Sequence, residues 1–408
     1  MRRILILLPA VMLLAAMLPA AMPPMAALAE GVTLYTVSSF AGADASAAAY
    51  VELLKAFEES TGHVVVDSSA SSDETWKTSV LYDFAAGNEP DILFFFAASA
   101  DSAPILSRVV PIDEINAAYP DLMLPENASV AETDGRVYAI PVRPFWEALF
   151  VNTDLFERYG VALPDTWDKL ETAIRRFTEE GVVPISVSLS DIPHYLVEMS
   201  ILVCSSPEEY AARPASLEEV PASWYEGMAL IRRLYQLGAF ADNASATTEE
   251  MSSQLFRTKK AAMQIDGSWF ANSIPQESMD TTIVMPMPAY AEDADPQAFV
   301  GGTSMGFYLT RRAWEDPARR DAAVQLLAWL TGKDSVRALG GMELTGALLE
   351  SSYALLEHSG SMYRPLQDDM NRLARETWLL NCVPAVAEGS MTPEECWQTV
   401  MALQAFEE

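Results

Sequence analysis

The first part of the chain alternates between segments with the period of a strand and segments with the period of a helix. Val32–Val37 and His63–Asp67 are rich in β-branched residues, and Asp91–Phe96 is a continuous apolar run, as expected for a strand buried on both faces. Between these strands, Ala47–Glu59 and Glu74–Ala86 carry their apolar residues at helical spacing. This order predicts a parallel sheet covered by helices, an α/β lobe.

A similar pattern recurs after Asn152. Thr166 is a predicted N-cap for an amphipathic helix, and Val182–Leu189 is the next predicted strand. Asp321–Leu330 and Pro393–Phe406 are predicted amphipathic helices, the second with proline at its first position. We therefore expect two α/β lobes, although the order of elements alone does not reveal how often the chain crosses between them.

The N-terminus has the features of a targeting segment. Arg2 and Arg3 precede an apolar run, Ile4–Met22, and Ala27-Leu28-Ala29 provides a small-residue cleavage site. We expect residues 1–29 to be a signal peptide that directs export, with an uncleaved signal anchor as the alternative. No cysteine lies near the predicted cleavage site, so a lipid anchor is not expected.

Composition narrows the possible partners. Half of the 408 residues are hydrophobic and the formal net charge is −31, which indicates a globular chain that repels nucleic acid and anionic membranes. The acidic balance fits a solvated surface, while a cationic ligand remains an alternative. Cys204, Cys382 and Cys396 are too few for a disulfide framework. One bridge could form, and the pairing is not predicted.

One motif has the sequence of a catalytic site. Gly302–Gly306 matches the nucleophile elbow of α/β-hydrolases, with Ser304 as nucleophile. A loop-like segment precedes it and the predicted strand Phe307–Leu309 follows, which is the reverse of the strand-to-helix context that the elbow needs. The three histidines are isolated, and no cysteine–histidine cluster has metal-ligand spacing. We expect no enzymatic activity, no cofactor and no metal site, and keep a hydrolase using Ser304 as a competing hypothesis.

Two segments more than a hundred residues apart resemble segments of a known protein family. The first is Asp134–Val142 together with Phe150–Phe156 and Leu163–Trp167, and the second is Phe256–Trp269. They resemble the extracellular solute-binding proteins of ABC importers, specifically the carbohydrate-binding family that includes maltose-binding protein. The resemblance implies a two-lobed periplasmic-binding-protein fold, type II-like, in which two α/β lobes are joined by hinge strands and the ligand cleft lies between them.

The resemblance also implies a division of the chain and a function. Lobe 1 would comprise residues 30–142 plus 265–330, and lobe 2 residues 143–264 plus 331–408. A monomeric, exported protein would capture a sugar or oligosaccharide in the cleft and deliver it to the membrane permease subunits of an ABC importer. The alternatives are the same fold binding a non-sugar solute, such as a polyamine or another cation, and a sensor or adhesin without a permease.

Ligand contacts are expected where the family places its cleft. Asp266-Gly267-Ser268-Trp269 matches the family's N/D-G-x-W motif, in which the tryptophan faces the ligand, and Ser38-Ser39-Phe40 matches its first ligand loop. The turn Ala97–Ala100 lacks the charged sugar contacts of maltose-binding protein, so maltose itself is not indicated. Aromatic faces would cover sugar rings and polar side chains would bond their hydroxyls. The expected ligand contacts are Ser38, Ser39, Phe40, Phe95, Phe96, Arg143, Trp146, Glu147, Tyr195, Asp266, Trp269 and Trp378.

Overall fold

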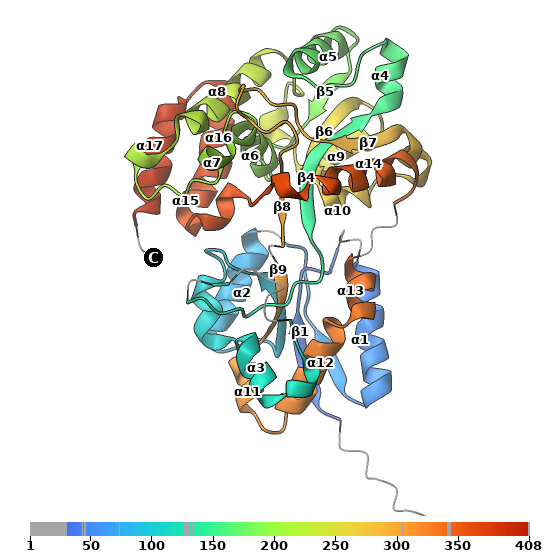
Figure 1. Cartoon of the computed structure of the whole chain (residues 1–408), viewed down its shortest axis with the longest axis vertical. Helices are drawn as coiled ribbons and strands as arrows, with labels where there is room; N and C mark the ends of the chain where they lie inside the picture. Colours follow the sequence, from blue (N-terminus) through green and yellow to red (C-terminus); the bar gives the residue numbers. More distant parts are fainter. Residues whose placement is uncertain are drawn as a thin grey trace, which may run out of the picture.

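The computed structural model describes residues 31–406 except 43, 45, 73, 126–130, 133, 304 and 341–343. The predicted signal peptide, residues 1–29, and the hydrolase candidate Ser304 lie outside the described residues. Figure 1 shows two lobes that lie one above the other along the long axis of the molecule. None of the helices within the described ranges is long and apolar enough to cross a bilayer.

The first lobe is built on a four-stranded sheet of order β2-β1-β3-β9. Its strands are β1 (Thr33–Val37), β2 (Val64–Asp67), β3 (Ile92–Phe96) and β9 (Met305–Leu309). β1, β2 and β3 run parallel, as the sequence predicts, while β9 pairs with β3 in antiparallel orientation. The α-helices of this lobe are α1 (Ala47–Thr61), α2 (Glu74–Ala86), α3 (Ile112–Ala118), α11 (Arg311–Glu315), α12 (Arg320–Leu330) and α13 (Lys333–Gly340).

The second lobe is built on a larger sheet of order β10-β8-β4-β6-β5, with β7 paired to β4. The strands are β4 (Phe145–Asn152), β5 (Val183–Ser186), β6 (Ala261–Gly267), β7 (Thr282–Met285), β8 (Phe299–Gly302) and β10 (Met362–Tyr363). The α-helices are α4 (Thr153–Tyr159), α5 (Trp167–Glu179), α6 (His194–Leu202), α7 (Pro207–Tyr210), α8 (Ala222–Gln236), α9 (Glu249–Arg257), α10 (Ser268–Ala271), α14 (Gly346–Glu357), α15 (Arg372–Thr377), α16 (Val383–Glu388) and α17 (Pro393–Gln404). A short 3₁₀ helix, η7 (Leu366–Asp369), and a π-helical turn, η8 (Trp378–Cys382), belong to the C-terminal part.

Local signals explain where several helices begin. The Thr166 side chain accepts a hydrogen bond from the Lys169 backbone N–H, which caps α5 as predicted. At α17, Thr392 and Glu395 form a reciprocal capping box ahead of the amphipathic segment. Both helices bury their apolar face in the core of the second lobe. The three cysteines are buried and free, so the bridge that the sequence allowed is not formed.

The lobe boundaries differ from the expected ones at two places. Residues 265–302 were expected in the first lobe, but β6 pairs with β4, with Ile265 opposite Leu149, and β8 pairs with the other edge of β4. Because β4 is flanked by both strands, the second sheet continues to Gly302, and the chain returns to the first lobe only between β8 and β9 (Figure 1). α13, expected in the second lobe, packs on α1 and α12 in the first.

Candidate functional site

A cavity of about 240 Å³ lies where the two lobes meet. Ala97, directly after β3, contributes from the first lobe, and the start of β4 and the end of β8 contribute where the chain crosses between lobes. The segment from β10 to η7 closes the cavity from the second lobe. The lining residues are Ala97, Pro144, Phe145, Gly301, Gly302, Thr303, Met362, Arg364, Pro365 and Asp368.

A second recess, of about 410 Å³, lies between α2 and α15. It is larger, but it is a wide surface depression lined by Thr75, Thr78, Ser79, Tyr82 and Glu376. None of its lining residues belongs to the segments that cross between the lobes at β4 and β8. The smaller cavity is therefore the better candidate for a ligand site.

Aromatic side chains lead from the cavity into the second lobe. Trp269 is half-buried, and its ring lies 6.0 Å from that of Phe145 and 5.6 Å from that of Tyr195, measured between centroids. Glycine is required at position 267 of the motif, because a Cβ there would lie 2.1 Å from the Trp269 indole. Gly267 therefore lets Trp269 fold back over the end of β6.

Four buried carboxyl groups gather near this end of the second lobe: Glu147, Glu198, Asp266 and Asp368. Asp266 accepts hydrogen bonds from the Gln264 amide (2.6 Å) and from the Gly267 backbone N–H (2.7 Å). One oxygen of Glu198 accepts from the Gln367 backbone N–H at 2.9 Å. The other Glu198 oxygen and Oε2 of Glu147 are buried without a hydrogen-bond partner.

Burial raises the pKa of all four groups. It raises the pKa of Glu198 and Asp266 to about 8 each, and that of Glu147 well above its usual value, with the Glu198 charge adding to the effect. The pKa of Asp368 rises to about 6, because burial outweighs the opposing effect of the nearby Arg364 guanidinium. At neutral pH Glu198 and Asp266 are therefore mostly protonated, whereas Asp368 is mostly ionised.

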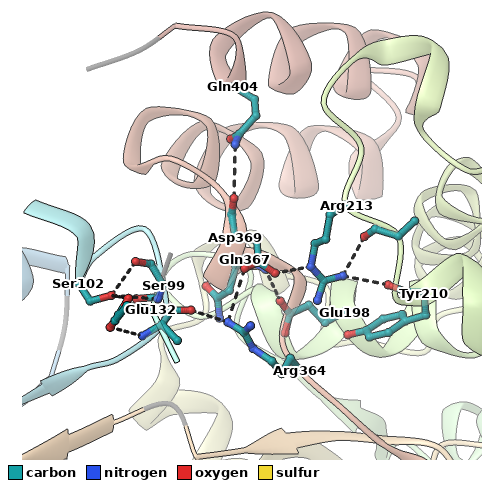
Figure 2. Close-up of polar contacts among 12 residues, drawn as sticks. Ser99, Ser102, Glu132, Glu198, Tyr210, Arg213, Arg364, Gln367, Asp369 and Gln404 are labelled. Carbon is teal, nitrogen blue, oxygen red and sulfur yellow. Dashed lines mark hydrogen bonds and ion pairs between the residues drawn. The ribbon is translucent and has the colours of Figure 1, made fainter. Parts of the chain in front are cut away.

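Polar contacts join the lobes beside the cavity, as Figure 2 shows. Arg364 of the second lobe donates to the Ala98 carbonyl oxygen at 2.7 Å, and the Ala100 backbone N–H donates to the Asp368 carbonyl oxygen at 3.0 Å. Ala98 has a left-handed backbone (φ 51°), which is unfavourable for a residue with a Cβ. Its N–H donates to Glu132 at 2.8 Å, so hydrogen bonds on both sides hold this strained turn in place.

An ion pair connects the lobes behind this turn. Both guanidinium Nη atoms of Arg375 in α15 donate to the Asp101 carboxylate, at 2.8 and 3.0 Å, and both side chains are buried. A bidentate pair of this kind fixes geometry as well as charge. The described arrangement is thus one in which the lobes are in direct contact on the α2–α15 side.

Several predicted site residues lie near the cavity. Trp269, Tyr195, Asp266 and Glu147 converge at the second-lobe end of β4 and β6, and Phe96 directly precedes the cavity residue Ala97. The Phe96 ring is partly exposed and carries the Lys77 ammonium 4.3 Å above it.

Other predicted residues are used within the first lobe. Ser38 and Ser39 are buried at the end of β1, where the Ser38 hydroxyl lies 2.6 Å from that of Ser69. The Arg143 guanidinium is bound to Asp44 at 2.5 Å. Ser38 and Arg143 thus already have protein partners, whereas the Ser39 hydroxyl is buried without a hydrogen-bond partner among the described residues.

Four predicted contacts lie in hydrophobic cores: Phe40, Phe95, Trp146 and Trp378. Phe40 stacks on Phe94 with centroids 4.6 Å apart, and Trp378 has no exposed surface and packs 5.4 Å from Trp397. Strand alternation explains Phe95 and Trp146, because successive side chains point to opposite faces of a sheet. When Glu147 faces the acidic cluster, Trp146 must face the core on the other side.

Four residues of the cavity lining or the acidic cluster are not among the predicted contacts: Phe145, Glu198, Arg364 and Asp368. Phe145 was detectable, since it adjoins the predicted crossing at Arg143. The other three belong to no motif, and only the return of the chain after α14 brings Arg364 and Asp368 to the cavity.

The fold and the position of this cavity define a class: a two-lobed binding protein with its candidate site at the junction of the lobes. Residues 42–337 match the family described as bacterial extracellular solute-binding protein. The chain belongs to that family. The predicted family and the predicted two-lobed α/β fold are thereby confirmed.

Individual relatives are distant. The melibiose/raffinose/stachyose-binding protein of Bacillus subtilis (strain 168) is 23% identical over 214 residues, 50% of this chain and 49% of that protein. The multiple sugar-binding protein of Streptococcus mutans serotype c is 20% identical over 236 residues, 55% of each chain. The chain thus spans about half the length of the curated relatives it matches. A solved chitin oligosaccharide binding protein superimposes with a TM-score of 0.76 at 18% identity, over 92% of this chain and 98% of that one.

Proposed function

We propose that this protein captures a sugar or oligosaccharide between its lobes and delivers it to the membrane permease of an ABC importer. The observation that carries the proposal is the combination of Phe145 and Trp269 with polar groups at the interlobe cavity. Aromatic rings can cover the apolar C–H faces of a sugar, and buried polar groups can bond its hydroxyls. The named relatives bind melibiose, raffinose, stachyose, multiple sugars or chitin oligosaccharides, which supports the same ligand class here.

Delivery to the permease would depend on closure of the two lobes around the ligand. A ligand that contacts both lobes favours the closed arrangement by its difference in affinity for the two states, and a permease would recognise the closed pair of lobes. Export by the signal peptide at residues 1–29 and action as a monomer are parts of this proposal. Binding without chemical conversion of the ligand is another part.

The test is a thermal-shift screen of the chain from residue 30 onward. The ligands are D-galactose, melibiose, raffinose, stachyose, N,N′-diacetylchitobiose and spermidine. A ligand at 100 times its Kd stabilises the protein by about 2.7 kcal/mol, which gives a clear rise in Tm. We expect a shift with at least one sugar and none with spermidine.

Trp269→Ala locates the site. The half-buried indole forms part of the aromatic surface beside the cavity, so we expect its removal to abolish the sugar-induced shift. Trp167→Ala is the matched control, because Trp167 is also partly buried but packs on Tyr290 at 4.9 Å in the second lobe. A shift with spermidine alone would contradict the sugar proposal, and a sugar shift that survives Trp269→Ala would move the site elsewhere.

A further inference from the structure

Asp368 stands apart from the other carboxylates that line or approach the cavity. It lines the cavity directly and only 8% of its surface is exposed. Within the described part of the chain its carboxylate accepts no hydrogen bond and forms no ion pair. A buried, ionised group without partners is costly. The structure therefore contains an acceptor that a ligand in the cavity could satisfy.

The surroundings of Asp368 are nearly balanced in charge. Arg364 also lines the cavity, and its positive charge lowers the pKa of Asp368 while burial raises it. Arg364 itself donates to the Ala98 carbonyl and lies 3.5 Å from Asp369. A cation entering the cavity would meet Arg364 as well as Asp368, whereas a neutral ligand with hydroxyl donors would meet no repulsion.

The size of the cavity limits how much of a ligand it can hold. Its volume of about 240 Å³ is below the ~300–1,000 Å³ typical of pockets that enclose drug-sized ligands. One sugar ring is a suitable occupant, and the rest of an oligosaccharide would extend beyond it. Phe145, on the same lining, offers an aromatic surface for the apolar face of such a ring.

We propose that Asp368 is a specificity-determining residue of this cavity, where its carboxylate accepts hydrogen bonds from hydroxyl groups of one neutral sugar ring. This inference depends on the proposed function and refines it, since it names the ring's hydroxyls as the recognised groups and excludes an ammonium group in their place. The backbone of the same residue accepts the hydrogen bond from Ala100 across the lobes. A ring held by the carboxylate is therefore held beside an interlobe contact.

The test measures Kd by titration calorimetry for D-galactose, D-glucose and N,N′-diacetylchitobiose with wild type and Asp368→Asn. Hydrogen bonds to a charged group contribute enough that their loss should weaken binding about ten- to hundredfold. Glu388→Gln is the matched control, because Glu388 is exposed at the end of α16 in the same lobe, and it should leave Kd unchanged. Asparagine has nearly the shape of aspartate, and unchanged Tm values without ligand will show that the variant is folded.

A second arm separates hydroxyl recognition from cation recognition. D-galactosamine and D-glucosamine replace one hydroxyl of the corresponding sugar with an ammonium group. We expect each amino sugar to bind wild type more weakly than its parent sugar. For a monodeoxy sugar that binds wild type more weakly than its parent, we expect Asp368→Asn to cause little further loss of affinity. That second pattern would not arise if Asp368 only supported the fold.

The outcomes distinguish the two proposals. If no neutral sugar binds wild type, the proposed function and the inference both fail. If sugars bind but Asp368→Asn has the wild-type Kd, only the inference fails. Tighter binding of the amino sugars than of their parents would show that the cavity recognises a cation, and would overturn the inference in that way.

Discussion

The two lobes differ in how they hold their buried acids. In the first lobe, Glu89 lies 2.5 Å from Arg108, and Asp91 lies 3.1 Å from Arg319. Glu132, beside the lobe junction, instead accepts hydrogen bonds from the Ala98 backbone N–H and the Ser102 hydroxyl. In the second, Glu147, Glu198, Asp266 and Asp368 are equally buried, but none of them forms an ion pair with any residue that the structure describes. One aromatic residue from each lobe shows a similar contrast. Phe40 is packed inside the first lobe, while Trp269 keeps part of its ring exposed in the second.

This difference separates residues that stabilise the fold from residues that can recognise a ligand. A buried acid with an arginine partner has its interactions within the protein, so it has little to gain from a ligand. A buried acid without a partner costs folding energy, which a ligand can recover by supplying hydrogen bonds. We infer that the second lobe carries most of the ligand recognition and that the first lobe mainly closes the cavity.

The largest effect is expected at Phe40, which the sequence analysis placed at the ligand. Its ring packs on Phe94 and Tyr50 with 2% of the residue exposed, so Phe40→Ala should lower the free energy of unfolding by about 3–5 kcal/mol. Sugar affinity, measured well below Tm, should be unchanged. Phe406→Ala is the control, because Phe406 is 64% exposed. A Phe40→Ala protein of normal stability that no longer binds sugar would reverse the distinction between the lobes.

Asp91 tests the paired acids. Its carboxylate accepts from Arg319 and from the Tyr35 backbone N–H at 2.8 Å, and Asp91→Ala would leave both donors without this partner. We expect a loss of about 3 kcal/mol in urea denaturation, as for other broken buried pairs. Asp113→Ala breaks a pair with Arg136 in which both side chains are exposed, and should cost at most about 1 kcal/mol. Equal losses in the two variants would show that burial does not set the strength of these pairs.

The helices and strands that the sequence predicted are found in the structure because their signals are local. Three examples are the apolar run of β3, the Thr166 cap of α5 and the capping box of α17. The residues that make up each of these signals are only a few positions apart in the sequence. The predicted boundary at residue 265 failed because it depends on which strand β6 pairs with, and the pairing with β4 joins residues more than a hundred positions apart.

The site was only partly predictable for the same reason. The motif that contains Trp269 is contiguous, and its glycine has a direct steric role, so this contact could be proposed from sequence. Asp368 is an ordinary acidic residue in sequence, and it becomes notable only because the fold buries it at the cavity. Trp378 shows the opposite case, since an aromatic residue expected at the cleft fills a core between helices instead.

Glu198 gives the most direct test of the unpaired acids, and its effect appears as a change in the slope of stability with pH. Burial raises its pKa to about 8, whereas the unfolded chain releases this proton near pH 4.3. Between these values the folded protein holds one more proton than the unfolded one at this site, so its contribution to stability is complete at low pH and is lost as pH rises towards 8. Glu198→Gln removes this titration and keeps an acceptor for the Gln367 N–H.

Urea denaturation at pH 5, 6, 7 and 8 measures the difference. One proton corresponds to a slope of up to about 1.4 kcal/mol per pH unit, so the unfolding free energy of wild type should fall more steeply with pH than that of Glu198→Gln by at most that amount. Glu388→Gln, at an exposed position, should keep the wild-type slope. If Glu198→Gln also keeps it, Glu198 is ionised in the folded protein at neutral pH. The second lobe would then contain a charged partner for Glu198, and the contrast with Asp91 would be lost.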